Sequence, residues 1–270
     1  LQRNELPDEE EQFRTYRDVV LGMSGRPVTI RTLDLGADKA DRTGLVLGNE
    51  ENPALGLRGV RLSLVHGDLF DTQLRAIVRA SGYGPVRVLV PMISNREEVV
   101  AVRKRLKRVA DKLRKQGAEV ADDIPIGAMI EVPAAAIALH AFVDLVDFLS
   151  IGTNDLVQYL LAADRNNDAL GELYSPLNPG VVRLLKHIIN VANEHQTPVA
   201  VCGEIAGDAK LAPLLLALGL TEFSLHPATL LEVRKAIRHS DLAVLKARTD
   251  KLLQARDRTG IENWLKSVSA

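Results

Sequence analysis

Short apolar runs along the chain are separated by longer stretches in which apolar residues recur at helical spacing. Residues 145–165 show this most clearly. An apolar run over 146–151 has the character of a buried strand. The Gly-Thr-Asn-Asp sequence at 152–155 suits a turn and a helix start, and residues 156–163 then follow a helical period. The pattern therefore predicts a hidden strand that delivers an amide and a carboxylate to its C-terminal end.

The same alternation continues through the rest of the chain. It predicts strands at 28–33, 57–62, 86–92, 126–130, 145–151, 198–207 and 221–225. It predicts helices at 7–21, 67–80, 95–116, after Pro133, and at 179–195, 211–220, 227–238 and 241–256, while the pattern leaves 259–270 unassigned. Such alternation implies a parallel sheet with right-handed crossovers. The 270 residues match the usual size of one α/β barrel, so we expect a single domain over 1–270, although seven strands are one short of a barrel's eight.

Composition narrows the class of protein. The chain is 46% hydrophobic and 26% charged with a net charge of −1, so no general attraction to nucleic acid or to an anionic membrane is implied. It lacks an apolar run of about 20 residues, so we expect no transmembrane helix. One cysteine fits the reducing cytoplasm. The acidic N-terminus is no signal peptide and has no initiator Met, so we expect a fragment or a processed piece.

Two carboxylates follow predicted strands that are neighbours along the chain. Glu131 comes directly after the strand at 126–130, and Asp155 comes just after the strand at 145–151. Two acids at one mouth of a barrel suit a hard cation, most simply Mg²⁺, which takes few protein ligands and keeps waters for the substrate. The alternative is that each acid caps a helix or pairs with an arginine. For the pair at matching strand ends we favour the metal.

Three arginines are predicted at or near the same rim, namely Arg31, Arg58 and Arg165. Guanidinium groups bind phosphate or carboxylate in a bidentate manner, so three beside a Mg²⁺ site indicate a small, strongly anionic ligand. A single strand-end arginine can equally be a structural ion-pair partner. Asn154 can donate to such a ligand through its side chain or backbone, or it can act as a helix N-cap.

Cys202 is the only cysteine, and it ends a predicted strand just before Gly203 and Glu204. A thiol at that place can donate or accept a proton at carbon. From spacing alone, the better interpretation is a small and inert buried residue. The six histidines are scattered, and their spacing predicts no metal site.

Five segments together carry a resemblance to a known family: TIRTLDLGADK, ENPALGLRGVRL, IGAMIEVPAAA, DFLSIGTNDLVQYLLAADR and VCGEIAGD. They resemble the C-terminal domain of enzyme I of the phosphoenolpyruvate (PEP)-dependent phosphotransferase system, whose wider relatives are pyruvate phosphate dikinase and PEP synthase. The resemblance covers nearly the whole chain. It implies a (β/α)8 TIM barrel that binds PEP and Mg²⁺. In the family, the phosphoryl group passes to a histidine on a separate N-terminal domain and pyruvate is released.

The resemblance also implies residue roles. Glu131 and Asp155 match the Mg²⁺ ligands, and Cys202 matches the acid that protonates the enolate carbon, which reverses the interpretation of that residue from spacing. The residues that match the family's PEP-binding residues are Arg31, Arg58, Asn154, Asp155 and Arg165. The implied partners are PEP and pyruvate, the phosphohistidine domain, a downstream histidine phosphocarrier and a second copy in a homodimer, with no nucleic acid and no membrane.

Two departures from the family pattern qualify these expectations. The first barrel strand, with a further phosphate-binding arginine, is expected just before Leu1, which would explain the count of seven strands. No histidine here lies in the family's phosphohistidine motif. The stretch HPATLLEVRK at 226–235 favours the nitrogen-system paralogue. Alternative functions are a dikinase or synthase fragment, or a ligand-sensing dimerisation module without activity of its own.

Overall fold

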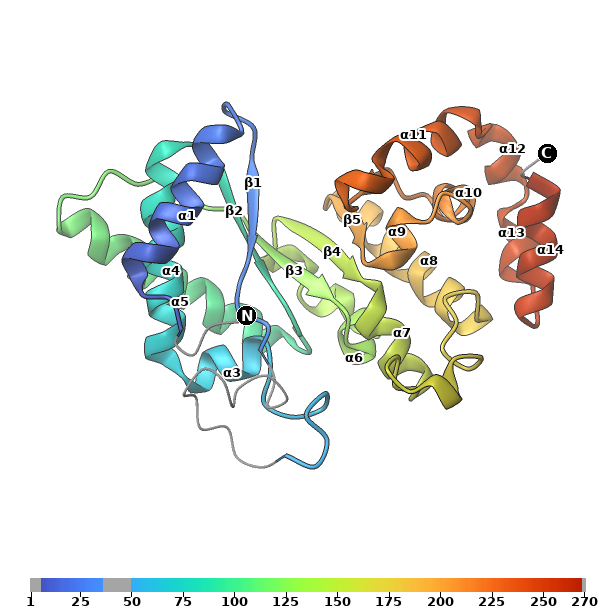
Figure 1. Ribbon diagram of the computed structural model, residues 1–270, viewed down its shortest axis with the longest axis horizontal. Helices are drawn as coiled ribbons and strands as arrows, with labels where there is room; N and C mark the ends of the chain where they lie inside the picture. Colours follow the sequence, from blue (N-terminus) through green and yellow to red (C-terminus); the bar gives the residue numbers. More distant parts are fainter. Residues whose placement is uncertain (1–5, 36–49, 269–270) are drawn as a thin grey trace. The chain divides into compact units, whose positions relative to one another are not determined.

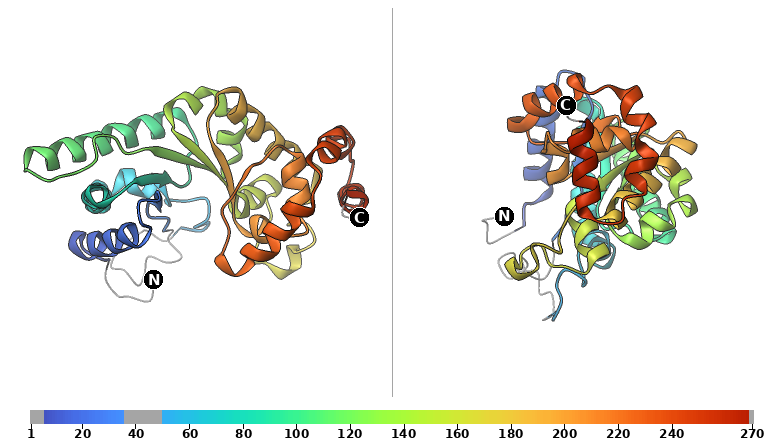
Figure 2. Two further views of the ribbon diagram at one scale, coloured as in Figure 1. Left: turned by 90° about the horizontal axis from the view of Figure 1, so that it is seen from above. Right: turned by 90° about the vertical axis from the view of Figure 1, so that its right-hand side faces the viewer.

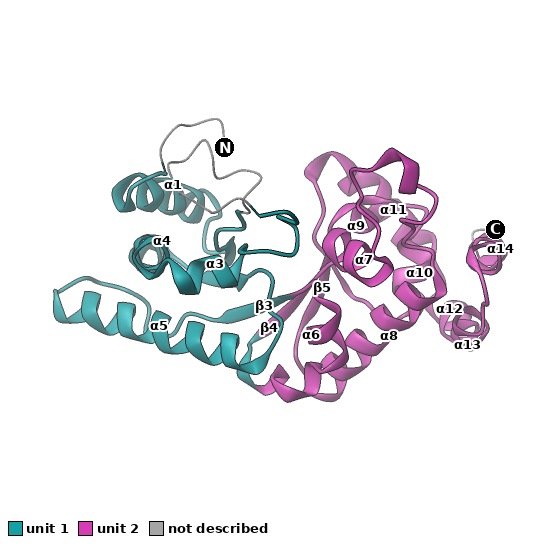
Figure 3. Cartoon of the chain, turned by 90° about the horizontal axis from the view of Figure 1, so that it is seen from below, with its two compact units in different colours: residues 1–129, 145–147 teal, residues 130–144, 148–270 magenta. Residues whose placement is uncertain are grey.

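The computed structural model describes residues 6–35 and 50–268 of the chain. These residues divide into two compact units, which Figure 3 shows in different colours. Unit 1 runs to Met129 and includes Leu145–Asp147, and unit 2 comprises Ile130–Asp144 and the chain from Phe148 onward. In both units, parallel strands alternate with helices, so the predicted α/β class is confirmed. Within the described residues, no helix combines the length and apolar composition needed to cross a membrane.

Unit 1 contains parallel strands that pair in chain order, together with four helices and a short 3₁₀ turn within its described residues. Strand β1 (Val28–Arg31) pairs with β2 (Val86–Val90), which pairs with β3 (Ile126–Ile130). The helices are α1 (Glu9–Gly22), α3 (Val60–Val65), α4 (Gly67–Ala80) and α5 (Arg96–Lys115), with a 3₁₀ turn at Ser81–Tyr83. Helix α4 packs against both α1 and α5 (Figures 1 and 2).

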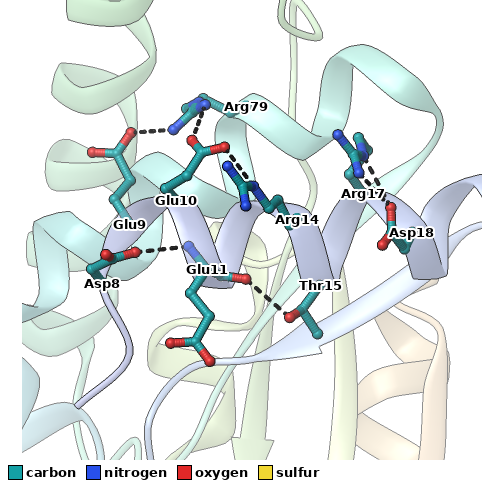
Figure 4. A network of polar contacts seen from close by, with 9 residues as sticks. All are labelled: Asp8, Glu9, Glu10, Glu11, Arg14, Thr15, Arg17, Asp18 and Arg79. Atoms are coloured by element: carbon teal, nitrogen blue, oxygen red, sulfur yellow. Dashed lines mark hydrogen bonds and ion pairs between the residues drawn. The ribbon is translucent and has the colours of Figure 1, made fainter. Parts of the chain in front are cut away.

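Ion pairs connect α1 to α4. Asp8 caps α1, and its carboxylate accepts a hydrogen bond from the Glu11 amide at 2.8 Å. Arg79 of α4 reaches back to Glu9 and Glu10, with N–O distances of 2.8 Å to each carboxylate (Figure 4). The same guanidinium lies 4.0 Å from the centre of the Phe13 ring. Ion pairs and the stacking of Arg79 on Phe13 therefore lie along the contact between α1 and α4.

Helix α5 begins where the sequence predicts. The Asn95 side chain accepts from the Glu98 amide at 2.9 Å, and the Glu98 carboxylate accepts from the Asn95 amide at 3.3 Å, so the two residues form a capping box at the start of α5. The inner face of α5 is apolar, with Val99, Val102, Leu106, Val109 and Leu113 all buried. Basic residues on the outer face of α5 pair with acidic residues of unit 1; Asp71, for example, pairs with Arg105 and Arg108 at 2.6 Å each.

Unit 2 continues the alternation from the end of β3. Strand β4 (Phe148–Gly152) is buried along its whole length and pairs in parallel with β5 (Val199–Cys202), which pairs with the short β6 (Glu222–Phe223). Between and after them lie α6 (Pro133–Ile137), α7 (Thr153–Leu161), α8 (Pro179–Glu194), α9 (Glu204–Gly207), α10 (Ala212–Ala217), α11 (Leu230–His239), α12 (Leu242–Ala247), α13 (Thr249–Leu253) and α14 (Arg258–Val268). Short 3₁₀ turns lie at Leu139–Ala141, Val143–Leu145, Asp168–Leu170 and Pro227–Thr229.

The C-terminal tail that the sequence pattern left unassigned forms helix α14. Its buried face carries Ile261 and Trp264. The Trp264 indole N–H donates to the Arg248 carbonyl at 2.9 Å, which ties α14 to the turn between α12 and α13. Only two buried residues anchor a helix of 11 residues, so the apolar stripe was too narrow to identify from the sequence.

The predicted strand at 57–62 is wrong, because residues from Val60 onward form helix α3. Val60, Leu62 and Ser63 are buried, and the alternation of Val60, Arg61 and Leu62 resembled a strand only because the segment is short. Gly59 precedes α3 with φ 58°, and a Cβ there would lie 2.7 Å from the Cβ of Met92. A glycine at this close approach lets the chain turn into α3. The described residues therefore contain six strands rather than seven.

Candidate functional site

Glu131 and Asp155 lie where the sequence places them, at the C-terminal ends of consecutive strands. Glu131 follows β3 and is 1% exposed, and Asp155 lies in the first turn of α7 after β4 and is 8% exposed. Neither residue is an N-cap, since Val132 and Gly152 hold those positions, so helix capping does not explain them. Helices α6 and α7, which begin just after the two strands, pack against each other.

The donor set of these two acids suits a hard cation. Mg²⁺ prefers carboxylate oxygens and usually takes only one or two of them, with water and substrate oxygens completing its shell. Among residues 6–35 and 50–268, no cluster of three or more His, Cys, Asp or Glu side chains forms a metal cage. Coordination of one ion by Glu131 and Asp155 remains a prediction from the resemblance, and the buried oxygen donors fit it.

Asn154 links α7 to the segment that follows Cys202. Its side-chain N–H₂ donates to the Glu204 carboxylate at 3.3 Å, and its side-chain oxygen accepts from the Glu204 amide at 3.1 Å. Gly203 makes this approach possible: its φ is 95°, and a Cβ there would lie 2.8 Å from the Asn154 oxygen. The N-cap alternative for Asn154 is wrong, because its side chain is engaged with Glu204 and Gly152 is the N-cap.

Cys202 ends β5 and is partly buried, opposite Gly152 of β4. The Ser150 hydroxyl lies 3.2 Å from the Cys202 sulfur, and the sulfur lies 3.4 Å from the Ile151 carbonyl oxygen. The Thr153 hydroxyl donates to the Cys202 carbonyl at 2.8 Å. Side chains and backbone from the end of β4 therefore hold both the thiol and its main chain.

Arg165 lies in the loop between α7 and α8, and Tyr174 lies later in the same loop. The Arg165 amide donates to the Gln158 side chain at 3.2 Å, and the Tyr174 hydroxyl donates to the Asn154 carbonyl at 3.0 Å. Burial raises the pKa of Tyr174; the positive charge of Arg165 opposes this rise, while the carboxylates of Glu204 and Asp155 add to it. The Tyr174 hydroxyl thus contacts the Asn154 backbone, and its pKa responds to the charges of Arg165, Glu204 and Asp155.

Arg31 and Arg58 form a second group, in unit 1, around a carboxylate that sequence reasoning missed. Two guanidinium nitrogens of Arg58 lie 3.0–3.2 Å from the Asp34 oxygens, and one of Arg31 lies 3.7 Å from the same carboxylate. Asp34 and Arg58 have side chains 7% and 14% exposed, whereas that of Arg31 is 52% exposed. The turn at Gly59 places Arg58 just before α3.

The sequence contained signals for some of the missed residues. Asp34 lies three positions after Arg31, within a stretch used for the resemblance and just after the predicted strand at 28–33. Glu204 lies two positions after Cys202, inside another stretch used for the resemblance. Ser150 and Tyr174 carried no signal, because a serine within a buried strand and a tyrosine in a loop are common in any α/β protein.

Comparisons with known proteins agree on one family. A family model described as "PEP-utilising enzyme, PEP-binding domain" matches residues 1–242. The chain is 48% identical over 256 residues to a phosphoenolpyruvate-protein phosphotransferase of Cupriavidus necator, covering 94% of this chain and 44% of the relative. The same-named protein of Priestia megaterium is 43% identical over 266 residues, covering 98% and 46%, and that of Listeria monocytogenes is 46% identical over 239 residues, covering 88% and 42%.

The chain thus spans less than half the length of these relatives. Among solved structures, a citrate lyase from Burkholderia xenovorans is similar with a TM-score of 0.50 and 18% identity, over 98% of this chain and 89% of that one. That likeness concerns the fold alone. Together, the match over residues 1–242 and the relatives at 43–48% identity establish that this chain belongs to the PEP-utilising enzymes, in the family of their PEP-binding domains.

Proposed function

We propose that this chain is the PEP-binding catalytic domain of a phosphoenolpyruvate-protein phosphotransferase. The family match over residues 1–242 carries the proposal, and the relatives' shared name supports it. The domain would bind PEP, pass its phosphoryl group to a histidine of a separate domain, and release pyruvate. A dikinase or synthase fragment is less favoured, since the relatives described above are all named as protein phosphotransferases.

Charge neutralisation is the main task of such a site, because phosphoryl transfer needs positioning and electrostatic stabilisation more than covalent help. Arg31, Arg58 and Arg165 would neutralise the phosphate and carboxylate of PEP through bidentate contacts. Glu131 and Asp155 would hold Mg²⁺, which supplies further positive charge beside the phosphoryl oxygens when bound. Asn154 has both ends of its side chain engaged with Glu204, so it would contact PEP through its backbone N–H or through its remaining amide proton.

Cys202 would complete the reaction. When the phosphorus–oxygen bond of PEP breaks, the phosphoryl group bonds to an imidazole nitrogen and an enolate remains. The Cys202 thiol gives its proton to the terminal carbon of the enolate, a carbon–hydrogen bond forms, and pyruvate leaves. The thiol stands at the end of β5, the position from which side chains of parallel α/β folds reach ligands.

The wider setting belongs to the same proposal. The acceptor would be a phosphohistidine domain of the same enzyme, which passes the group to a histidine phosphocarrier in the cytoplasm, and the barrel would form a homodimer. The lengths of the relatives support a separate domain, because the relatives extend well beyond the region that matches this chain. The nitrogen-system paralogue remains our prediction from the stretch at 226–235.

Calorimetry with PEP, with and without Mg²⁺, tests the binding function. We expect Mg²⁺-dependent binding that Glu131→Gln and Asp155→Asn abolish, and that Glu172→Gln, an exposed acid in the loop between α7 and α8, leaves intact. Arg165→Ala should weaken binding, and unchanged affinity would remove that residue from the site. Absence of PEP binding by the folded chain would refute the proposal.

Transfer to a supplied phosphohistidine domain tests the catalytic function. Cys202→Ala should slow pyruvate formation far more than it weakens PEP binding, because the thiol acts only after phosphoryl transfer begins. Equal losses in both would count against the proton-donor role. Binding without any transfer would favour the alternative of a ligand-sensing module.

A further inference from the structure

The hydrogen bonds at the Cys202 sulfur have a defined direction. The sulfur contacts the Ser150 hydroxyl at 3.2 Å and the Ile151 carbonyl oxygen at 3.4 Å. A carbonyl oxygen can only accept, so the thiol proton of Cys202 is directed to Ile151. The sulfur must then accept from Ser150, whose hydroxyl proton is directed at the sulfur lone pairs. The thiol in this state is both a donor and an acceptor.

The environment of Ser150 keeps this contact in place. Ser150 is 6% exposed in the middle of β4, a strand buried along its whole length. It pairs with Ala200 of β5, and Gly152 pairs with Cys202 in the same ladder. The parallel pairing therefore fixes the separation of the two side chains.

A donor aimed at sulfur matters most after the thiol has lost its proton. A hydrogen bond to an ionised acceptor is roughly twice as strong as one between neutral groups. Ser150 therefore binds the thiolate more strongly than the thiol, and an interaction that strengthens along the reaction coordinate lowers the barrier.

We propose that Ser150 is a positioning residue that stabilises the thiolate formed when Cys202 protonates the enolate carbon, an inference that rests on the proposed function. In the step, the sulfur–hydrogen bond breaks, its proton bonds to the terminal carbon of the enolate, and the electron pair stays on sulfur, where the Ser150 hydroxyl donates to it. In reverse, the Ser150-stabilised thiolate removes a proton from the methyl group of pyruvate. After the forward step, solvent reprotonates the thiolate of the partly exposed Cys202, and after the reverse step the thiol exchanges its newly gained proton with solvent.

The reverse step gives an assay that needs only this chain. We would measure exchange of the pyruvate methyl protons with deuterium from heavy water by NMR, in the presence of Mg²⁺ and without any phosphohistidine domain. Ser150→Ala should lower the maximal exchange rate about tenfold while leaving the KM for pyruvate nearly unchanged. Ser150→Thr keeps the hydroxyl and should restore most of the rate. Ser63→Ala, which alters a buried serine of α3 in unit 1, should behave as the unaltered chain does.

The results of the exchange assay test the role of Ser150 and the proposed function separately. Exchange that Cys202→Ala abolishes and Ser150→Ala leaves unchanged would overturn the role of Ser150 alone, as would a Ser150→Thr variant as slow as Ser150→Ala. Folded, unaltered chain that shows no exchange would overturn the proton-transfer function and this inference with it.

A spectroscopic signature gives a second readout that is independent of activity. Cys202 is the only cysteine, so the Raman S–H stretching band of the chain has a single source. Ser150→Ala should shift this band because the sulfur loses its donor, whereas Ser63→Ala should not. An unchanged band in Ser150→Ala would overturn the proposed contact.

Discussion

The carboxylate of Asp34 pairs with two arginines that differ in burial, and the difference between their contributions to the free energy of unfolding can be measured. Arg58 approaches it with contacts of 3.0–3.2 Å and is 14% exposed, whereas Arg31 lies 3.7 Å away and is 52% exposed. Coulomb attraction between Arg31 and Asp34 is largely screened by solvent, whereas the Arg58 pair is held in a fork away from water. Asp34→Asn should therefore destabilise unit 1 chiefly through Arg58.

The expected changes in the free energy of unfolding follow from the burial of the two ion pairs. Removing one partner of a largely buried ion pair costs about 3–5 kcal/mol when the other charge is left isolated. Arg58 has further contacts and some exposure, so we expect about 2–3 kcal/mol for Asp34→Asn. Arg31→Met should cost about 0–1 kcal/mol, the usual range for an exposed pair. A double-mutant cycle should give a coupling energy of about 2 kcal/mol for Arg58 with Asp34, and at most about 0.5 kcal/mol for Arg31 with Asp34.

Urea unfolding followed by circular dichroism gives the free energies, and hydrogen exchange of the α3 and α4 amides assigns them to unit 1. Fluorescence provides an internal control, because the only tryptophan, Trp264, lies in unit 2. Equal coupling energies for the two arginines would refute the reasoning. So would an Asp34→Asn variant as stable as the unaltered chain, since burial would then not govern the strength of this pair.

Three further predictions concern single residues. Gly203→Ala should destabilise the fold by about 1–3 kcal/mol more than Gly117→Ala. Both glycines have positive φ, but only a Cβ at 203 would meet other atoms. Equal shifts of the melting temperature in the two variants would contradict this. Asn95→Ala should cost about 1 kcal/mol by removing the α5 cap, and an unchanged urea midpoint would count against that role. Burial raises the pKa of Tyr174 above its ordinary value of 10.0, so as pH rises the unfolded chain loses this proton first; the stabilisation is complete below about pH 10 and is lost above it. Tyr174→Phe should reduce the decline of the urea midpoint above about pH 10, and an unchanged decline would refute this.

Much of the fold follows from the sequence because local signals and burial agree there. The capping box at Asn95, the buried run over β4 and the strand end at Glu131 each have a local physical cause. The strand predicted at 57–62 failed because a segment of six residues cannot distinguish a period of two from a helical one. What decides its conformation is the approach of Gly59 to Met92, a contact between residues 33 positions apart in the chain.

The candidate site was predictable to a different extent. Side chains at strand ends, such as Glu131 and Cys202, could be selected because topology brings strand ends to one edge. Asp34 and Tyr174 were missed because their roles arise from pairing with partners that only the folded chain supplies, Arg58 for one and the Asn154 carbonyl for the other. The single-domain expectation and the metal-binding role of Glu131 and Asp155 remain predictions.

The double engagement of Asn154 with Glu204 has a consequence for inhibitor chemistry. A compound that seeks the carboxamide of Asn154 must compete with two existing intramolecular hydrogen bonds, so part of its interaction energy only replaces what the free protein already has. A compound that presents an anion to the exposed guanidinium of Arg165 displaces bulk solvent instead. Selection for affinity should therefore enrich anionic groups directed at Arg165 over neutral amide mimics directed at Asn154.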